Sequence, residues 1–104
     1  MPILYDRKKL IIIAVIALSG AISACTGMAP VQEMSNARQT LMTAKAVRAD
    51  VYARDAYGRA KGFLDAAAIE LNSGDYYRAR ELAVLAAHEA KQARLDAISH
   101  QKSD

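Results

Sequence analysis

Residues 72–97, NSGDYYRARELAVLAAHEAKQARLDA, contain both the clearest helix boundary and the most regular apolar pattern of this 104-residue chain. Gly74 suits the left-handed backbone conformation that ends many helices, and Asp75 suits the capping position of the next helix. Beyond this turn, alanines recur at alternating steps of four and three residues, at Ala79, Ala83, Ala86, Ala90, Ala93 and Ala97. The spacing predicts a helix over residues 76–99 with an alanine seam along one side.

Two further helices are expected before the turn. The first spans residues 30–49, where Pro30 is tolerated at the first helical position and Glu33 complements the helix dipole. Its apolar stripe consists of Met34, Ala37, Leu41, Ala44 and Val51. The second spans residues 54–72, with an apolar stripe of Ala56, Ala60, Phe63, Ala67 and Leu71. Because no glycine or proline separates these helices, the boundary at residues 50–53 follows from the apolar pattern alone.

The predicted fold class is all-α, a three-helix arrangement dominated by an antiparallel helical hairpin with an alanine-rich seam. The short turn at residues 72–75 requires the last two helices to run antiparallel. An alanine seam lets helices approach closely. One buried methyl contributes under about 1 kcal/mol, against roughly 1.5–3 kcal/mol for a buried leucine. We therefore expect a thin core whose remaining apolar face is covered by the first helix, by a second copy or by a partner protein.

Two groups of residues leave alternatives open. Gly58 and Gly62 lie one turn apart in the second helix, either because another backbone approaches them closely or because glycine is tolerated at the surface. Four tyrosines fall near the two ends of the hairpin: Tyr52, Tyr57, Tyr76 and Tyr77. They are interpreted either as a contact patch or as covers for the ends of a thin core.

The first 24 residues are typical of a secretory signal peptide. A head with three basic residues, MPILYDRKK (1–9), precedes the unbroken apolar run LIIIAVIAL (10–18), and small residues follow. The alternative is an uncleaved transmembrane anchor. Spanning a bilayer takes about 20 apolar residues, and this run has nine. We therefore expect residues 1–24 to be removed after export.

Ile22-Ser23-Ala24-Cys25 resembles the bacterial lipobox, in which an aliphatic residue and two small residues precede a cysteine that carries diacylglycerol. The resemblance implies cleavage between Ala24 and Cys25 and a covalent lipid on Cys25, with residues 25–29 as a lipidated tether and residues 30–104 as a helical periplasmic domain. The alternative is ordinary cleavage that leaves a free thiol. Two or three acyl chains would hold the protein on a membrane essentially permanently, because each buried methylene contributes about 0.8 kcal/mol.

The charge of the chain gives little reason to expect a nucleic acid or an anionic membrane as partner. Four charged residues, Asp6, Arg7, Lys8 and Lys9, lie in the predicted signal, so the formal net charge falls from +3 for the whole chain to +1 without it. The remaining charges of both signs are interspersed, which is typical of a solvated helix surface.

No catalytic or metal-binding pattern is present in the sequence. His88 and His100, the two histidines, are twelve positions apart, whereas a metal pair on one helix face needs three or four. No nucleophile lies in a pattern with a base, and no glycine-rich phosphate loop occurs. We therefore expect no enzyme activity, no metal and no cofactor other than the lipid on Cys25.

Two resemblances to known families cover the predicted helices. Gly74-Asp75-Tyr76-Tyr77-Arg78-Ala79 with Leu82-Ala83 resembles the turn of a tetratricopeptide repeat, but no second copy is found, and such repeats need neighbours. A wider pattern resembles a family of small alanine-rich proteobacterial lipoproteins whose domain has no assigned function. It comprises Pro30, Met34-x-x-Ala37-Arg38, Ala44, Tyr52-Ala53, Ala60, Leu64, Ala67, Gly74-Asp75-Tyr76, Ala79, Leu82-Ala83, Ala86, Ala90 and Ala93. The chain departs from that family in having Arg54 after Ala53, where an Ala-Pro opening is usual.

These patterns predict a lipoprotein on the periplasmic face of the outer membrane of a Gram-negative bacterium. Thr26 follows the cysteine, in place of the aspartate that retains such proteins at the inner membrane. We expect the helical domain to be a structural or protein-interaction module, with the alanine seam of residues 79–97 as its contact face. The expected partner is an envelope protein or a second copy, and the resemblance implies a neighbour of the OmpA or peptidoglycan-associated type. The alternative is a binding module for peptidoglycan, a lipid or a metal.

Overall fold

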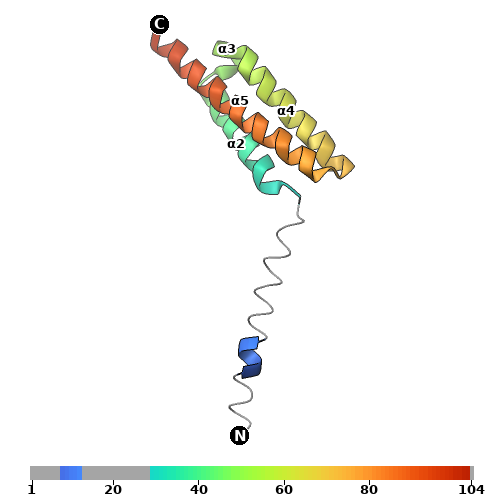
Figure 1. Cartoon of the computed structure of the whole chain (residues 1–104). Coiled ribbons are helices and arrows are strands. Elements are labelled where there is room, and N and C mark those ends of the chain that lie inside the picture. The colour runs from blue at the N-terminus through green and yellow to red at the C-terminus, as the bar shows by residue number, and fades with distance from the viewer. Residues whose placement is uncertain (1–7, 13–28, 104) are drawn as a thin grey trace.

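The computed structural model describes residues 8–12 and 29–103, and every regular element in these residues is a helix. Four helices form a bundle: α2 (Val31–Ala46), α3 (Ala49–Tyr52), α4 (Arg54–Ser73) and α5 (Tyr76–Ser103) (Figure 1). The all-α fold class is confirmed. Residues 8–12 are also helical, and Ala24 and Cys25, the expected cleavage and lipidation residues, lie outside the described part of the chain. No helix of the described residues is long and apolar enough to cross a membrane.

The long helices α2, α4 and α5 run up, down and up. α5 packs along both α4 and α2, while α3 forms a short corner between α2 and α4. Met34 near the start of α2 clusters with Leu82 near the start of α5, and Ala44 clusters with Ala93 and Ala97 near the other end. α2 is therefore parallel to α5, and both are antiparallel to α4.

The turn between α4 and α5 has the chemistry that its sequence predicts. Gly74 has φ of +89°, in the left-handed region. Its N–H donates to the carbonyl of Leu71, and the N–H of Asp75 donates to the carbonyl of Glu70, which together form a Schellman motif. Asp75 then caps α5, because its Oδ1 accepts the N–H of Arg78 at 3.0 Å. These bonds satisfy backbone groups at both helix ends and fix the hairpin.

The corner between α2 and α4 differs from the sequence prediction. The first helix was expected to reach residue 49, but α2 ends at Ala46, and Arg48 has φ of +63°. A non-glycine residue in the left-handed region costs about 1–2 kcal/mol. Two contacts with α5 favour this break: the side-chain amide of Gln101 donates to the carbonyl of Val47, and Ala49 packs on Ala93 and Ala97.

The break changes which residues of the first predicted helix face the core, and two helix ends elsewhere in the bundle also differ from the prediction. Val51, expected on the apolar stripe of the first helix, is exposed. The second helix begins at Arg54 as predicted, and Ala53 alone separates it from α3. α5 continues to Ser103, four residues beyond its predicted end, and this extension carries Gln101 to the corner. At the start of the bundle, Pro30 is the residue before α2 rather than its first residue, and its side chain is buried.

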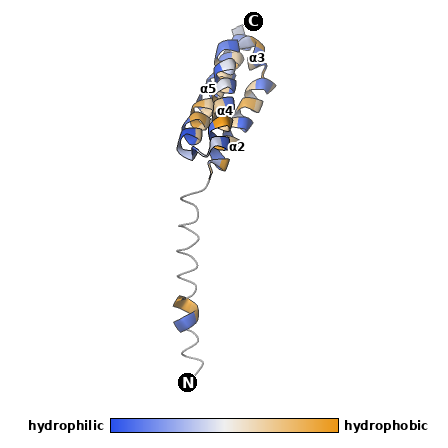
Figure 2. Cartoon of the chain, turned by 90° about the vertical axis from the view of Figure 1, so that its right-hand side faces the viewer, coloured by the Kyte–Doolittle hydropathy of each residue, from blue (hydrophilic) through white to orange (hydrophobic). Residues whose placement is uncertain are grey.

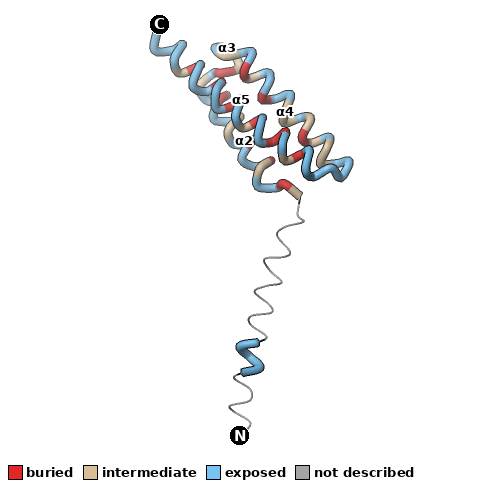
Figure 3. Tube along the Cα trace, viewed as in Figure 1, coloured by how far each residue is buried: buried red, intermediate tan, exposed pale blue. Residues whose placement is uncertain are grey.

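Alanine forms most of the core between the helices. Besides Pro30, fourteen buried hydrophobic residues are present among the described residues, and twelve of them are alanines; the other two are Met34 and Leu82. Figure 3 shows these buried positions along the inner sides of the long helices. Phe63, Leu64 and Leu71 are partly buried at the edges of the core. The sequence left open whether the first helix, a second copy or a partner protein covers the apolar face of the hairpin. In the structure the first helix covers it, because α2 packs along α5.

The glycines of α4 are surface positions. A Cβ atom added at Gly58 or at Gly62 would have no other atom within 4 Å. No backbone therefore approaches these residues within the bundle, and the interpretation as tolerated surface glycines fits the structure.

Candidate functional site

The alanine seam of α5 is inside the bundle. Its six members, Ala79, Ala83, Ala86, Ala90, Ala93 and Ala97, are each at most 2% exposed. Four of them, Ala83, Ala86, Ala93 and Ala97, cluster with buried residues of α2 and α4 of the same chain. The expected contact face therefore stays a prediction, and a partner would dock on this seam only if the bundle opened, because its own helices already fill the space beside the small side chains. The surfaces that the closed bundle offers to other molecules are therefore those on its outside.

The tyrosines divide between the two interpretations considered for them. Tyr57 packs against the core beside Ala56 and is partly buried. Tyr52, Tyr76 and Tyr77 are exposed, and Tyr77 is 72% exposed. An exposed tyrosine offers apolar area and a polar tip to a neighbouring molecule. Tyr52 lies at the α3 corner, while Tyr76 and Tyr77 begin α5 at the opposite end of the bundle.

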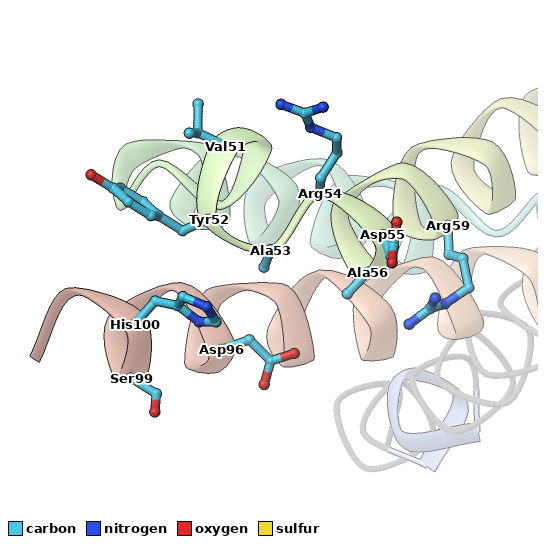
Figure 4. A pocket seen from close by; sticks show the side chains of 10 residues that line it. All are labelled: Val51, Tyr52, Ala53, Arg54, Asp55, Ala56, Arg59, Asp96, Ser99 and His100. Atoms are coloured by element: carbon cyan, nitrogen blue, oxygen red, sulfur yellow. The ribbon is translucent and has the colours of Figure 1, made fainter. Parts of the chain in front are cut away.

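An open pocket of about 620 Å³ lies at the α3 corner. We call it the distal pocket. Its lining combines residues 51–56 and Arg59 with three side chains near the end of α5: Asp96, Ser99 and His100. Figure 4 shows His100 rising from α5 below Tyr52, whereas Val51 and Arg54 point away from α5. The lining of the pocket therefore combines an aromatic ring, an imidazole, carboxylates and the guanidinium of Arg59, which can contact a polar ligand or a protein.

Ion pairs join α5 to α4 and to α2 at the surface. Arg59 Nε lies 3.1 Å from Glu89 Oε2 and connects α4 to α5, while Arg80 Nε lies 3.3 Å from Glu33 Oε1 and connects α5 to α2. Exposed pairs of this kind contribute about 0–1 kcal/mol each. These exposed pairs agree with the interpretation of the charges as a solvated helix surface. One of them, between Arg59 and Glu89, lies at the edge of the distal pocket.

A second, apolar hollow of about 410 Å³ lies on the outer face of α5. It is lined by Tyr77, Arg80, Glu81, Val84 and Leu85, which we call the proximal patch. Tyr77, Val84 and Leu85 are 72%, 55% and 43% exposed, so a large part of their apolar surface is in contact with solvent. Figure 2 shows apolar turns on α5, α4 and α2 toward this end of the bundle.

The sequence indicated one aromatic residue of each surface, Tyr52 and Tyr77, but not the residues that surround it. The apolar side of the proximal patch is visible in the sequence. Val84 and Leu85 follow Tyr77 by seven and eight positions, so the three residues lie on the side of the helix opposite the seam. The distal pocket has no such signal, because it joins α5 to a corner whose break at Arg48 the sequence does not indicate.

The histidines and carboxylates do not form a metal site in the described residues. No group of three or more potential ligands is found in residues 8–12 and 29–103. His88 is exposed in the middle of α5, and His100 lines the distal pocket. Comparisons with protein-family models, curated proteins and solved structures find no match for this chain.

Proposed function

We propose that this protein is a lipid-anchored module of the bacterial cell envelope whose helical bundle binds another envelope protein. The observation that carries the proposal is the order of residues 1–25: a basic head, a nine-residue apolar run, and Ile22-Ser23-Ala24-Cys25. In this order the cysteine is the lipid-bearing first residue of the mature chain, and Thr26 after it favours the outer membrane.

The two ends of the bundle lie at different distances from the proposed lipid anchor. α2 begins directly after Pro30, so the tether enters at the end where α4 turns into α5. The α3 corner and the distal pocket lie at the other end, about 30 Å away by the 1.5 Å rise of α5 between Tyr77 and Ala97. The distal end is therefore the one directed away from the membrane, and its exposed Tyr52 is of a residue type enriched in protein interfaces.

Replacement of the lipid acceptor tests the anchor. With Cys25→Ser, we expect incorporation of radiolabelled palmitate to be abolished and the protein to be lost from the outer-membrane fraction, because an oxygen does not replace the thiol in forming the thioether. The readouts are palmitate labelling and membrane fractionation of cells expressing the full chain. Ser35→Ala, an exposed change in α2, is the control and keeps both. Equal labelling of the Cys25→Ser variant contradicts the proposal.

Photo-crosslinking from the distal end tests the protein partner. Benzoylphenylalanine in place of Tyr52 should give a discrete crosslinked protein band in cells, because Tyr52 is exposed beside the distal pocket. The same probe at Asp65, an exposed position in the middle of α4, should give none. The bands are detected with an antibody to the protein and identified by mass spectrometry.

A non-protein ligand is the second candidate, and the mixed charges of the distal pocket favour it. In that case Tyr52 gives no protein adduct, and the purified lipoprotein is retained on isolated peptidoglycan. His100→Ala, in the lining of the pocket, should then reduce this retention. That pair of results would replace the protein partner with a cell-wall ligand while leaving the lipid anchor in place.

A further inference from the structure

We propose that the proximal patch on α5 rests on the membrane surface, so that the bundle is oriented on the bilayer by an apolar contact as well as by its tether. The proposal rests on the lipid anchor at Cys25 and adds to it a second point of contact. Its occupant is the interfacial region of the bilayer that holds the anchor.

The length of the tether places the patch near the bilayer. Pro30 follows Cys25 by five positions, and an extended chain spans at most about 3.6 Å per residue. The Cα atom of Pro30 thus lies within about 18 Å of the lipid-bearing residue. Pro30 is itself buried at the start of α2, so it belongs to the folded bundle.

The patch lies beside the point where the tether enters. Arg80, one of its residues, is paired with Glu33 in the first turn of α2 at 3.3 Å. Val31, in the same turn, is 67% exposed. Tyr77 and Val84 lie about one turn to either side of Arg80 along α5. An apolar surface held this close to a bilayer meets it at a high effective concentration, so a weak contact is sufficient.

The residue types of the patch fit a bilayer interface. Tyrosine is enriched where hydrocarbon meets water, because its ring is apolar and its hydroxyl is polar. The aliphatic side chains of Val84 and Leu85 lie two turns further along the same face. In the folded bundle these two side chains remain partly exposed to water. Their burial in the headgroup region would remove this apolar surface from water, which is favourable.

The charges of the patch make the contact apolar rather than electrostatic. Its Arg80 is paired with Glu33, and Arg78 Nη1 lies 3.5 Å from Glu81 Oε2. Each cation therefore has an acidic partner, and the patch carries no surplus of positive charge for anionic lipids. The contact should form on zwitterionic phospholipid and persist at high salt, where a polybasic contact weakens.

A single tryptophan tests the contact, because the chain contains none. The lipidated protein carrying Tyr77→Trp is reconstituted into vesicles of phosphatidylethanolamine and brominated phosphatidylcholine. We expect its emission to shift to shorter wavelength and to lose most of its intensity relative to vesicles without bromine. Tyr52→Trp, at the distal end and also exposed, is the matched control and should keep its intensity.

The outcomes separate the patch from the anchor. Quenching in the Tyr77→Trp variant alone, unchanged at high salt and reduced by Val84→Ser with Leu85→Ser, supports the proposal. Lipidated protein that floats with vesicles but shows no quenching at position 77, or equal quenching at position 52, overturns it and leaves the anchor intact. A concentration-dependent blue shift without bromine quenching assigns the patch to a second copy and also overturns it. Protein whose mass lacks the lipid refutes the anchor, and the proposal falls with it.

Discussion

Met34→Ala is expected to destabilise the bundle by about 2–5 kcal/mol, as is usual when a large buried side chain is truncated. Met34 is 1% exposed and lies among Ala37, Ala67, Leu82 and Ala83. The neighbouring alanines have no side-chain atoms beyond Cβ that could move into the cavity left by the methionine side chain. Because small domains have total stabilities of only about 5–15 kcal/mol, the change removes a large part of the whole.

The measurement is urea or thermal unfolding of the purified protein, followed by circular dichroism. Each kcal/mol should lower the midpoint temperature by about 4–8 °C for a domain of this size. Met42→Ala is a control on the same helix, because Met42 is 71% exposed, and a surface change of this kind stays within about 0.5 kcal/mol. A similar loss in both variants would contradict the assignment of Met34 as the main large side chain of the core.

Ala83→Leu is expected to destabilise the bundle by about 1–3 kcal/mol, although it adds apolar area and keeps helix propensity. Ala83 is 0% exposed and packs beside Met34 and Ala67, so α5 approaches α2 and α4 closely at this point. The additional carbon atoms of leucine fit only if a helix moves outward, which reduces the contacts along the rest of the seam.

Val84→Leu provides the comparison at the next position, where the side chain is 55% exposed and has space. It should change the free energy of unfolding by no more than about 0.5 kcal/mol. Both are measured by chemical denaturation. If Ala83→Leu stabilises the protein, the seam is loosely packed rather than filled by neighbouring helices, and the description of the core is wrong.

The parts of the fold that the sequence predicts are those set by local chemistry. Gly74 and Asp75 end one helix and begin the next through bonds to residues within five positions, so their types alone indicate the turn. The heptad spacing of the alanines likewise predicts the buried side of α5, because helical periodicity is a local property. The all-α class and the antiparallel hairpin follow from these two signals.

The break at Arg48 was not predictable in this way. The local sequence offers no glycine or asparagine at the left-handed position, and the contacts that favour the break come from Gln101 and from Ala93 and Ala97 on α5. Contacts between distant parts of the chain outweigh local propensity here. The distal pocket depends on the same corner, and therefore it is absent from the sequence analysis.

The seam shows a second limit of sequence reasoning. Periodicity identifies the apolar side of α5 but not what covers it, since α2, a second copy and a partner all satisfy the same pattern. In the structure α2 provides the cover, and the surfaces left for other molecules are the distal pocket and the proximal patch.

Intact-mass analysis of the protein purified from bacterial membranes in detergent tests the lipid anchor most directly. The account predicts one species that begins at Cys25 and carries the added mass of a diacylglycerol, with or without a further acyl chain on the new amino terminus. An unmodified chain that retains residues 1–24, or one that begins at Cys25 with a free thiol, would contradict the anchor and the membrane contact proposed for α5.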